Sequence, residues 1–175
     1  MTNKQQKTFK EFHKTTSSLL NALASLSEEQ INFSPKKGWS AGQIGEHILK
    51  SYASVQTLNG NTEKTVRPFD QKLEPIKTLF LDTSIKMDSP EAILPSKKKI
   101  VKKDLIKALE DRIEQIKEVI INRDLSLTCI DFSIPEYGEF TRFEWVWFNI
   151  YHTQRHLHQL ENRIALNNGK ERQSK

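Results

Sequence analysis

Residues 145–160 of this 175-residue chain read WVWFNIYHTQRHLHQL, and they indicate a helix whose apolar face carries two histidines. At about 100° per residue, His152 and His156 lie only about 40° apart around the helix and one turn apart along it. Both imidazoles can therefore reach a common point. Trp145 and Phe148 precede the pair on the same stripe, so the histidines lie on a face that is expected to be buried. The spacing is typical of a chelating pair, but it also arises by chance.

The apolar surroundings of the pair need a physical explanation. Burying two imidazoles without partners costs the desolvation of their ring nitrogens. Metal ligation would satisfy one nitrogen of each ring and hold the ring neutral. A pair of hydrogen-bonded core histidines is the alternative. Gln159 lies on the same stripe after His156 and is a candidate to orient a ligand from outside the metal's own ligand set, with ordinary helix packing as the alternative.

A third ligand would favour the metal site, and His47 is the candidate for it. His47 falls inside a helix predicted over residues 40–59, near Ile44 and Ile48 on its buried side. An unpaired histidine is not expected in such a position. Gly42 and Gly45 come just before it and would allow a neighbouring helix to approach closely.

The two other histidines and the single cysteine are expected to stay outside the site. His158 is about 200° from His156 around the same helix and points away from the pair. His13 has no polar neighbours that suggest a site. Cys129 cannot form an internal disulfide, and a buried, small apolar role is favoured over that of a nucleophile.

Apolar residues recur at helical spacing in four segments, which predicts an all-α four-helix bundle. The predicted helices cover residues 9–27, 40–59, 105–120 and 141–166. Two of them begin with capping-box spacing, in which a hydroxyl residue precedes a Gln or Glu by three positions. These pairs are Ser40 with Gln43 and Thr141 with Glu144.

The connections between the second and third helices and between the third and fourth are expected to be long and irregular. Residues 61–96 contain four prolines, and only residues 76–81 suggest a short helix. Residues 131–140 contain Pro135 and Gly138 and are predicted to be a loop.

Length and composition favour one domain over residues 1–166, followed by a polar tail at residues 167–175. The start of the chain lacks the apolar run of a signal peptide, and no stretch reaches the ~20 apolar residues of a spanning helix. We therefore expect a cytoplasmic protein without membrane contact. The net charge of +5 is modest. The lysines of residues 97–103 lack interleaved aromatic residues, so no nucleic-acid partner is expected.

These motifs together resemble the DinB/YfiT-like superfamily of four-helix-bundle metalloenzymes. The resemblance rests on Trp39-Ser40 ahead of His47, on Gly138 to Thr141 and Glu144-Trp145, and on the pattern H152xxxH156xxQ159. It spans nearly the whole chain. It implies that His47, His152 and His156 bind a divalent metal. Characterised members include transferases and isomerases that use low-molecular-weight thiols, and many others are described as hydrolases.

The resulting hypothesis is a metal-dependent enzyme, of the hydrolase type or the thiol-transferase type, that acts on a small molecule. It predicts a solvent-open metal with a cavity beside it. Zinc, nickel and ferrous iron all accept imidazole ligands, so the three histidines do not identify which metal is bound. A ligand-binding module without turnover and a structural or partner-binding bundle stay open as alternatives. Bundles of this shape commonly pair through helices, so a homodimer is also open.

Further side chains are candidates for roles around the metal. Trp145, Phe148 and Asn149 could line a pocket, although aromatic residues at helical spacing more often belong to a core. Glu46 and Glu144 are candidate acids or bases, and helix-surface or capping roles are favoured for both.

Overall fold

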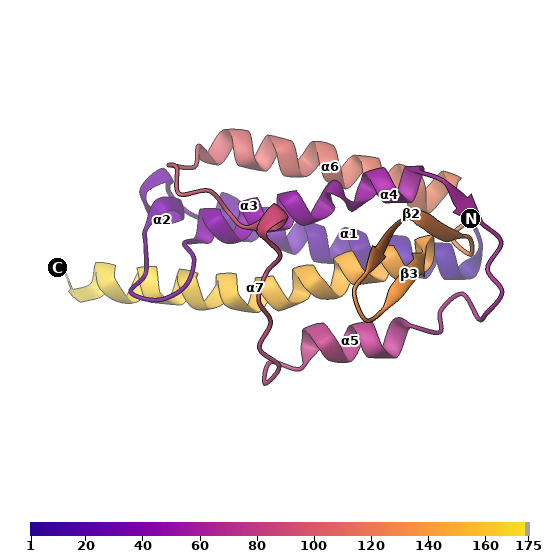
Figure 1. Ribbon diagram of the computed structural model, residues 1–175. Coiled ribbons are helices and arrows are strands. Elements are labelled where there is room, and N and C mark those ends of the chain that lie inside the picture. The colour runs from indigo at the N-terminus through magenta and orange to yellow at the C-terminus, as the bar shows by residue number, and fades with distance from the viewer. Residues whose placement is uncertain (174–175) are drawn as a thin grey trace.

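The computed structural model describes the backbone of residues 1–173 and the side chains of residues 1–166. Four long helical segments lie side by side and form the predicted bundle (Figure 1). The four are α1 (Asn3–Ala24), the run of α3 (Ala41–Ser51), η1 (Tyr52–Ser54) and α4 (Val55–Asn59), then α6 (Lys102–Asn122), and α7 (Arg142–Gln173).

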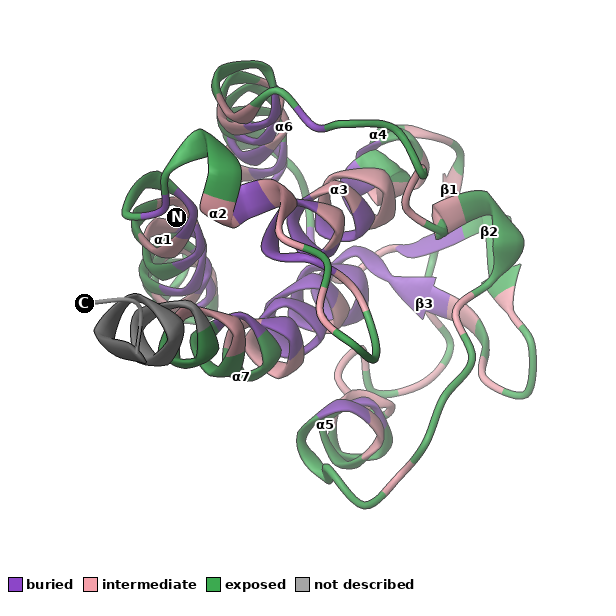
Figure 2. Cartoon of the chain, turned by 90° about the vertical axis from the view of Figure 1, so that its left-hand side faces the viewer, coloured by how far each residue is buried: buried purple, intermediate pink, exposed green. Residues whose placement is uncertain are grey.

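The connections carry shorter elements. They are α2 (Glu28–Asn32), β1 (Thr62–Glu63), α5 (Leu73–Leu81), η2 (Glu91–Ile93), β2 (Thr128–Ile134) and β3 (Gly138–Thr141). The short helix predicted over residues 76–81 is confirmed as α5, which packs against α7 outside the bundle (Figure 2). Within the described part of the chain, we find no helix that combines the length and the apolar character needed to cross a membrane.

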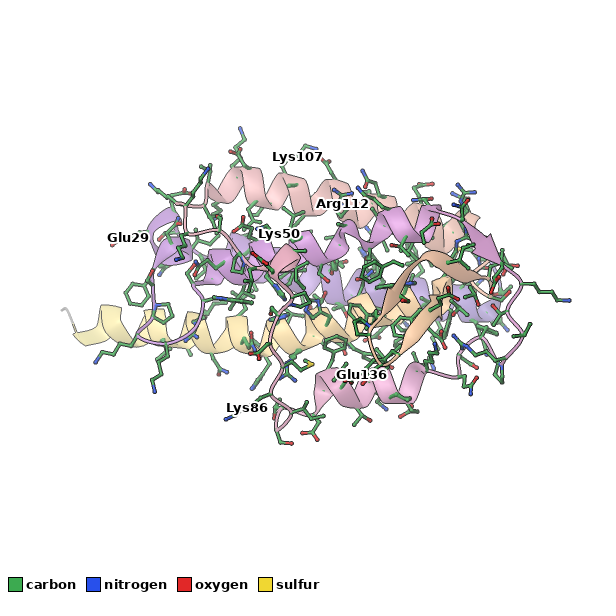
Figure 3. The ribbon with its side chains drawn as sticks, in the orientation of Figure 1. Glu29, Lys50, Lys86, Lys107, Arg112 and Glu136 are labelled. Carbon is green, nitrogen blue, oxygen red and sulfur yellow. The ribbon has the colours of Figure 1, made fainter. Side chains whose placement is uncertain are left out.

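The predicted apolar stripes meet in one core, and the buried sides of α1, α3, α6 and α7 face one another (Figure 2). The side chains that are at most 2% exposed include Phe12, Leu19, Leu23, Ile44, Ile48, Leu109, Ile113, Ile116 and Ile120. Each fully buried apolar side chain of this size contributes about 1.5–3 kcal/mol. The exposed Lys107 of α6 points away from the bundle (Figure 3).

Two glycines let α3 pack closely, as the sequence indicated. A Cβ atom at Gly45 would lie 2.9 Å from a methyl group of Leu105 and 3.1 Å from one of Leu23. A Cβ atom at Gly42 would lie 2.9 Å from the carbonyl oxygen of Ile31. At Gly42 the close atom belongs to the backbone and cannot easily move, so α3 needs glycine there to keep this position. At Gly45 a Cβ atom would force the Leu105 and Leu23 side chains to shift.

Both predicted capping boxes are present. Ser40 Oγ accepts from the backbone N–H of Gln43, whose Oε1 accepts from the backbone N–H of Ser40. Thr141 and Glu144 exchange the same pair of hydrogen bonds at the start of α7. The side chains therefore satisfy backbone groups that have no partner inside the helix.

Two predicted helix ends were wrong. The first helix begins at Asn3 instead of near Phe9, because Thr2 and Gln5 form a further capping box ahead of the apolar stripe. The last helix continues to Gln173, past the predicted end at 166, and no proline follows Pro135 to stop it. Residues 174–175 of the predicted tail lie outside the described residues.

The prediction of a loop over residues 131–140 was also wrong. β2 and β3 form an antiparallel hairpin across this region, and β1 adds to the other edge of β2, which gives a small sheet in the order β1-β2-β3. The turn holds Glu136 at φ 70° and Gly138 at φ 68°. Because apolar and polar residues alternate from residue 130 to residue 134, a strand pattern was present in the sequence.

Candidate metal centre

The three predicted histidines meet between α3 and α7, which lie beside each other in the bundle (Figure 1). Nε2 of His152 is 3.1 Å from Nε2 of His47 and 3.0 Å from Nε2 of His156. One ligand atom from each ring falls within 4.8 Å of the others. The sequence therefore identified the residues of the cluster correctly, across more than 100 positions of the chain.

The outward nitrogen of each ring has its own partner. Nδ1 of His47 donates to the carbonyl oxygen of Ile93 at 2.8 Å. Nδ1 of His156 lies 2.9 Å from Oε1 of Gln159, and Nδ1 of His152 lies 3.1 Å from Oγ of Ser51. Gln159 thus contacts the outward nitrogen of His156, and its role in orienting a metal ligand stays a prediction.

These partners bear on the tautomer of each ring. A carbonyl oxygen only accepts hydrogen bonds, so His47 carries its proton on Nδ1 and presents a lone pair at Nε2. Gln159 Oε1 favours the same tautomer in His156. The Ser51 hydroxyl can accept from Nδ1 of His152 or donate to it. With Nδ1 protonated in all three rings, three Nε2 lone pairs face one another, an arrangement that a cation would stabilise.

Burial keeps the three imidazoles neutral. The exposed fractions of His47, His152 and His156 are 1%, 5% and 6%. Desolvation lowers the pKa of His47 and lowers that of His152 far below the ordinary value of 6.5. Desolvation, with the neighbouring His47 as a smaller cause, lowers the pKa of His156 to about 4. All three rings are therefore neutral at pH 7, the state that can donate a lone pair to a metal.

The spacing of the donor atoms is close to what a small divalent ion requires. Imidazole nitrogens held tetrahedrally at ~2.0–2.1 Å from zinc lie roughly 3.4 Å apart. The two Nε2 separations around His152, 3.0 and 3.1 Å, would need to widen by only a few tenths of an ångström. The residues thus fit such an ion in chemistry and in spacing.

Aromatic side chains surround the cluster. The ring of Trp39 has its centroid 4.8 Å from that of His47 and 6.3 Å from that of His156. Phe80 of α5 and Phe148 of α7 lie 5.1 and 5.9 Å from His152. These rings exclude water from the histidines and lower the local dielectric constant, which strengthens electrostatic interactions inside the site.

A segment of chain at residues 93–96, which we call the strap, crosses α3 beside the cluster. Four α3 side chains bond to its backbone, namely Gln43, Glu46, His47 and Lys50. They are spaced by three, four and seven positions and so lie along one face of the helix. The strap therefore anchors the same face of α3 that presents His47.

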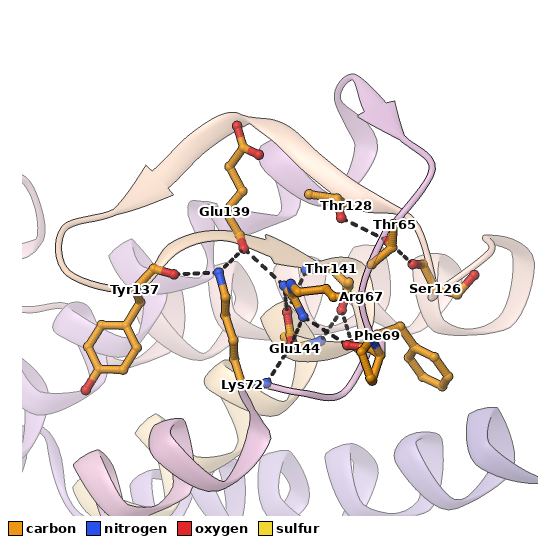
Figure 4. A network of polar contacts seen from close by, with 11 residues as sticks. Thr65, Arg67, Phe69, Lys72, Ser126, Thr128, Tyr137, Glu139, Thr141 and Glu144 are labelled. Atoms are coloured by element: carbon orange, nitrogen blue, oxygen red, sulfur yellow. Dashed lines mark hydrogen bonds and ion pairs between the residues drawn. The ribbon is translucent and has the colours of Figure 1, made fainter.

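Neither candidate acid or base is free to act as one. Glu46 accepts the backbone N–H of Ser96 at 2.7 Å and so holds the strap. Glu144 is fully buried and accepts both Nη groups of Arg67 at 2.7 Å, together with the backbone N–H of Lys72 (Figure 4). The capping role favoured for Glu144 is confirmed, and this carboxylate joins the segment before α5 to the start of α7.

The residues that the sequence set aside stay apart from the cluster. His13 and His158 are exposed. Cys129 is fully buried, and burial raises the pKa of its thiol to about 11, so the thiolate is scarce at neutral pH. The predicted structural role of this cysteine is therefore confirmed.

Several contributors were not found from the sequence. Ser51 lies four positions after His47, a helical spacing that could have indicated it. Phe80 lies in the short helix predicted over residues 76–81, but its contact with His152 depends on how that helix packs against α7. The Ile93 carbonyl could not have been found, since a backbone acceptor has no residue signature.

The cavity that the structure describes lies elsewhere than beside the histidines, where the sequence predicts one. A cavity of about 620 Å³ opens near the N-terminus of α1, between residues such as Lys4, Phe69, Arg123 and Phe143. None of the three histidines lines it.

Fold and site together define a class, a helical bundle that encloses three histidines contributed by two of its helices. The chain belongs to the DinB superfamily, whose family model matches residues 11–160. That range includes all three histidines, and the resemblance noted in the sequence is confirmed. No curated protein and no solved structure matches the chain.

Proposed function

We propose that the protein is a metal-dependent enzyme that acts on a small molecule, and that His47, His152 and His156 hold a divalent cation through Nε2. The observation that supports this proposal best is the convergence of the three Nε2 atoms while each Nδ1 bonds elsewhere. Membership of the DinB superfamily supports the same ligands, because the resemblance implies metal binding at these three positions.

Three neutral imidazoles as ligands support Lewis-acid chemistry at the proposed metal. When bound, such a cation keeps its full charge, lowers the pKa of a coordinated water or thiol, and polarises a substrate oxygen. The residues around the site orient the rings through the Ile93 carbonyl, Ser51 and Gln159, and exclude water through Trp39 and Phe80. We infer hydrolysis or transfer to a low-molecular-weight thiol, with zinc, nickel or iron as the metal.

A second candidate is a protein that holds the metal or a ligand without turnover. The exposure of the three histidines, at most 6%, favours it, because catalytic sites keep an open position for substrate. The two functions differ in how the bound metal responds to an added thiol. In a thiol-transferring enzyme, glutathione or cysteine changes the spectrum of the cobalt-substituted protein, whereas a closed site leaves that spectrum unchanged.

Metal content tests the proposed site. We would measure it by elemental mass spectrometry on tag-free protein that has never been exposed to a nickel column. Near-stoichiometric metal in the wild type, lost in His47→Ala and in His152→Ala, is the expected result. The matched controls are His13→Ala and His158→Ala, which remove exposed histidines and should retain the metal. Metal-free wild type that also fails to bind zinc and nickel in titrations would overturn the proposal.

Turnover is tested separately on metal-loaded protein. Panels of ester and amide substrates and of electrophiles with low-molecular-weight thiols should reveal an activity that a chelator abolishes and added metal restores. Sedimentation velocity tests the homodimer, which stays a prediction.

A further inference from the structure

One buried polar group in α7 has no hydrogen-bond partner among the residues that the structure describes. Trp145 is 4% exposed, and its Nε1 is the buried side-chain nitrogen or oxygen that forms no hydrogen bond among the described residues. Leaving a buried donor unsatisfied costs about 1–3 kcal/mol. Trp147, two positions later, shows the usual solution, since its Nε1 donates to Thr8 Oγ1 at 3.2 Å. A group that stabilised only the fold would be expected to have such a partner as well.

The position of Trp145 connects it with the histidine cluster. It precedes His152 by seven residues, which places it about 10 Å away along α7 and only about 20° away around the helix. Phe148 lies between the two, with its ring centroid 5.4 Å from that of Trp145 and 5.9 Å from that of His152. Trp145, Phe148 and His152 therefore form a continuous row on one face of α7.

The hairpin covers the far end of this row. Phe140 and Phe132 lie 5.3 and 6.0 Å from Trp145 between ring centroids, and Phe132 is 53% exposed. Phe132 is therefore the solvent-exposed edge of the cluster, whereas the Trp145 Nε1 atom and the Phe140 ring are buried.

The hairpin is irregular at this point. β2 pairs with β3 at Thr128↔Thr141 and at Ser133↔Glu139, with a register shift between. Residues 129–132 of β2 therefore oppose residue 140 alone. The ladder is locally interrupted here, and β-bulges, which are one form of such irregularity, are over-represented next to active sites, where they redirect side chains.

We propose that the aromatic cluster of Trp145, Phe148, Phe140 and Phe132 binds the apolar part of the substrate, and that the Trp145 indole N–H donates to an acceptor on it. This inference rests on the proposed function and specifies its substrate class. The substrate has an aryl or other apolar group with a carbonyl, ester or ether oxygen, and its reacting end lies toward His152, about two turns along α7 from Trp145.

The nearby charges indicate that this part of the substrate is uncharged. Lys72 Nζ lies 5.5 Å from the Phe140 ring centroid, but it already donates to the carbonyl oxygens of Tyr137 and Glu139 (Figure 4). Glu144, the residue before Trp145, is held by Arg67. The Trp145 N–H is thus the donor that remains for a neutral acceptor.

The test follows the indole N–H groups of the full-length ¹⁵N-labelled protein by NMR during titration with acetophenone. Ethylbenzene, which has a similar size and shape but lacks the oxygen, is the matched probe. Acetophenone should shift the Trp145 N–H downfield and saturably while the Trp147 N–H, already bonded to Thr8, stays in place. Ethylbenzene should bind roughly 5- to 10-fold more weakly, because it lacks one hydrogen bond.

Two variants separate the donor from the ring. Trp145→Phe keeps an aromatic side chain and should abolish the preference for acetophenone, whereas Trp147→Phe should retain it, with circular dichroism to confirm folding. Equal binding of both probes, or no binding of either, would overturn the proposal. So would a Trp145 N–H signal that lies upfield and does not respond to acetophenone, since the group would then be donating to an aromatic ring. Metal content measured in the same samples reports on the proposed function independently.

Discussion

The Nδ1–H of His47 donates to the carbonyl oxygen of Ile93 at 2.8 Å, so the strap determines which nitrogen this histidine presents to the cluster. The same strap is held by Glu46 and by Lys50 on the same face of α3. A backbone acceptor cannot be altered by substitution. Its position can be altered through the side chains that hold the strap.

Glu46→Ala should therefore weaken metal binding without touching a ligand. The backbone N–H of Ser96 loses its acceptor, the strap loosens, and the Ile93 carbonyl no longer holds His47 in place. Loss of such outer contacts typically lowers metal affinity 10- to 100-fold, and we expect the lower end, roughly 10-fold. Competition with a chromophoric zinc chelator measures the change. Glu110→Ala, an exposed change on α6, is the control, and equal affinities in the two variants would rule out this role for the strap.

Ser51 and Gln159 orient the other two rings. Ser51→Ala and Gln159→Ala should each lower zinc affinity roughly 10- to 100-fold while the fold is retained. Ser51→Thr, which keeps the hydroxyl, should recover most of the loss. Ser18→Ala, an exposed serine of α1, provides the matched control. If Ser51→Ala and Ser51→Thr bind zinc equally well, the hydroxyl has no part in positioning His152.

The stability of the metal-free protein should depend on pH between 6.5 and about 4. The pKa values of the three buried histidines lie below 6.5 in the folded state, so the unfolded chain binds more protons in this range. The free energy of unfolding should therefore fall as the pH falls, by up to about 1.4 kcal/mol per pH unit for each histidine.

Urea unfolding of chelator-treated protein at pH 7, 6 and 5 measures this slope. His156→Gln should reduce the slope, because one depressed pKa is removed. A stability that does not vary between pH 7 and 5 would contradict neutral burial of the cluster.

Glu144 is predicted to matter for stability alone. Glu144→Ala leaves Arg67, only 21% exposed, without its bidentate partner and should cost about 3–5 kcal/mol in the free energy of unfolding. Asp111→Ala removes the exposed Lys107–Asp111 pair and should cost less than about 1 kcal/mol. Chemical denaturation gives both values. A Glu144→Ala protein that is as stable as the wild type but no longer binds metal would contradict this prediction, because Glu144 would then contribute to metal binding instead of stability.

The helices and the histidine cluster could be predicted because both depend on how residue types are spaced along the sequence. His152 and His156 differ by one helical turn, and His47 is conspicuous among apolar neighbours. The hairpin was missed because Pro135 and Gly138 indicated a loop, although the alternation beside them was that of a strand. Pro135 lies in the turn between β2 and β3, and Gly138 is the first residue of β3.

Other parts of the site could not be predicted from the identity of any residue. The Ile93 carbonyl acts through the backbone, and the strap comes from an irregular stretch whose position depends on tertiary packing. The unpaired N–H of Trp145 becomes visible only when all its neighbours have been placed. Spacing could predict which side chains share a helix face, but not which atoms lack partners.

The most direct test of the proposed metal site is a long-range ¹H–¹⁵N NMR spectrum of the five histidine rings during zinc titration. The structure predicts that His47, His152 and His156 carry the proton on Nδ1 in the zinc complex, and that their Nε2 signals shift and saturate at one equivalent. The signals of His13 and His158 should not change. Nε2 signals of the cluster that stay unchanged in excess zinc, or changes confined to His13 and His158, would contradict the three-histidine metal site.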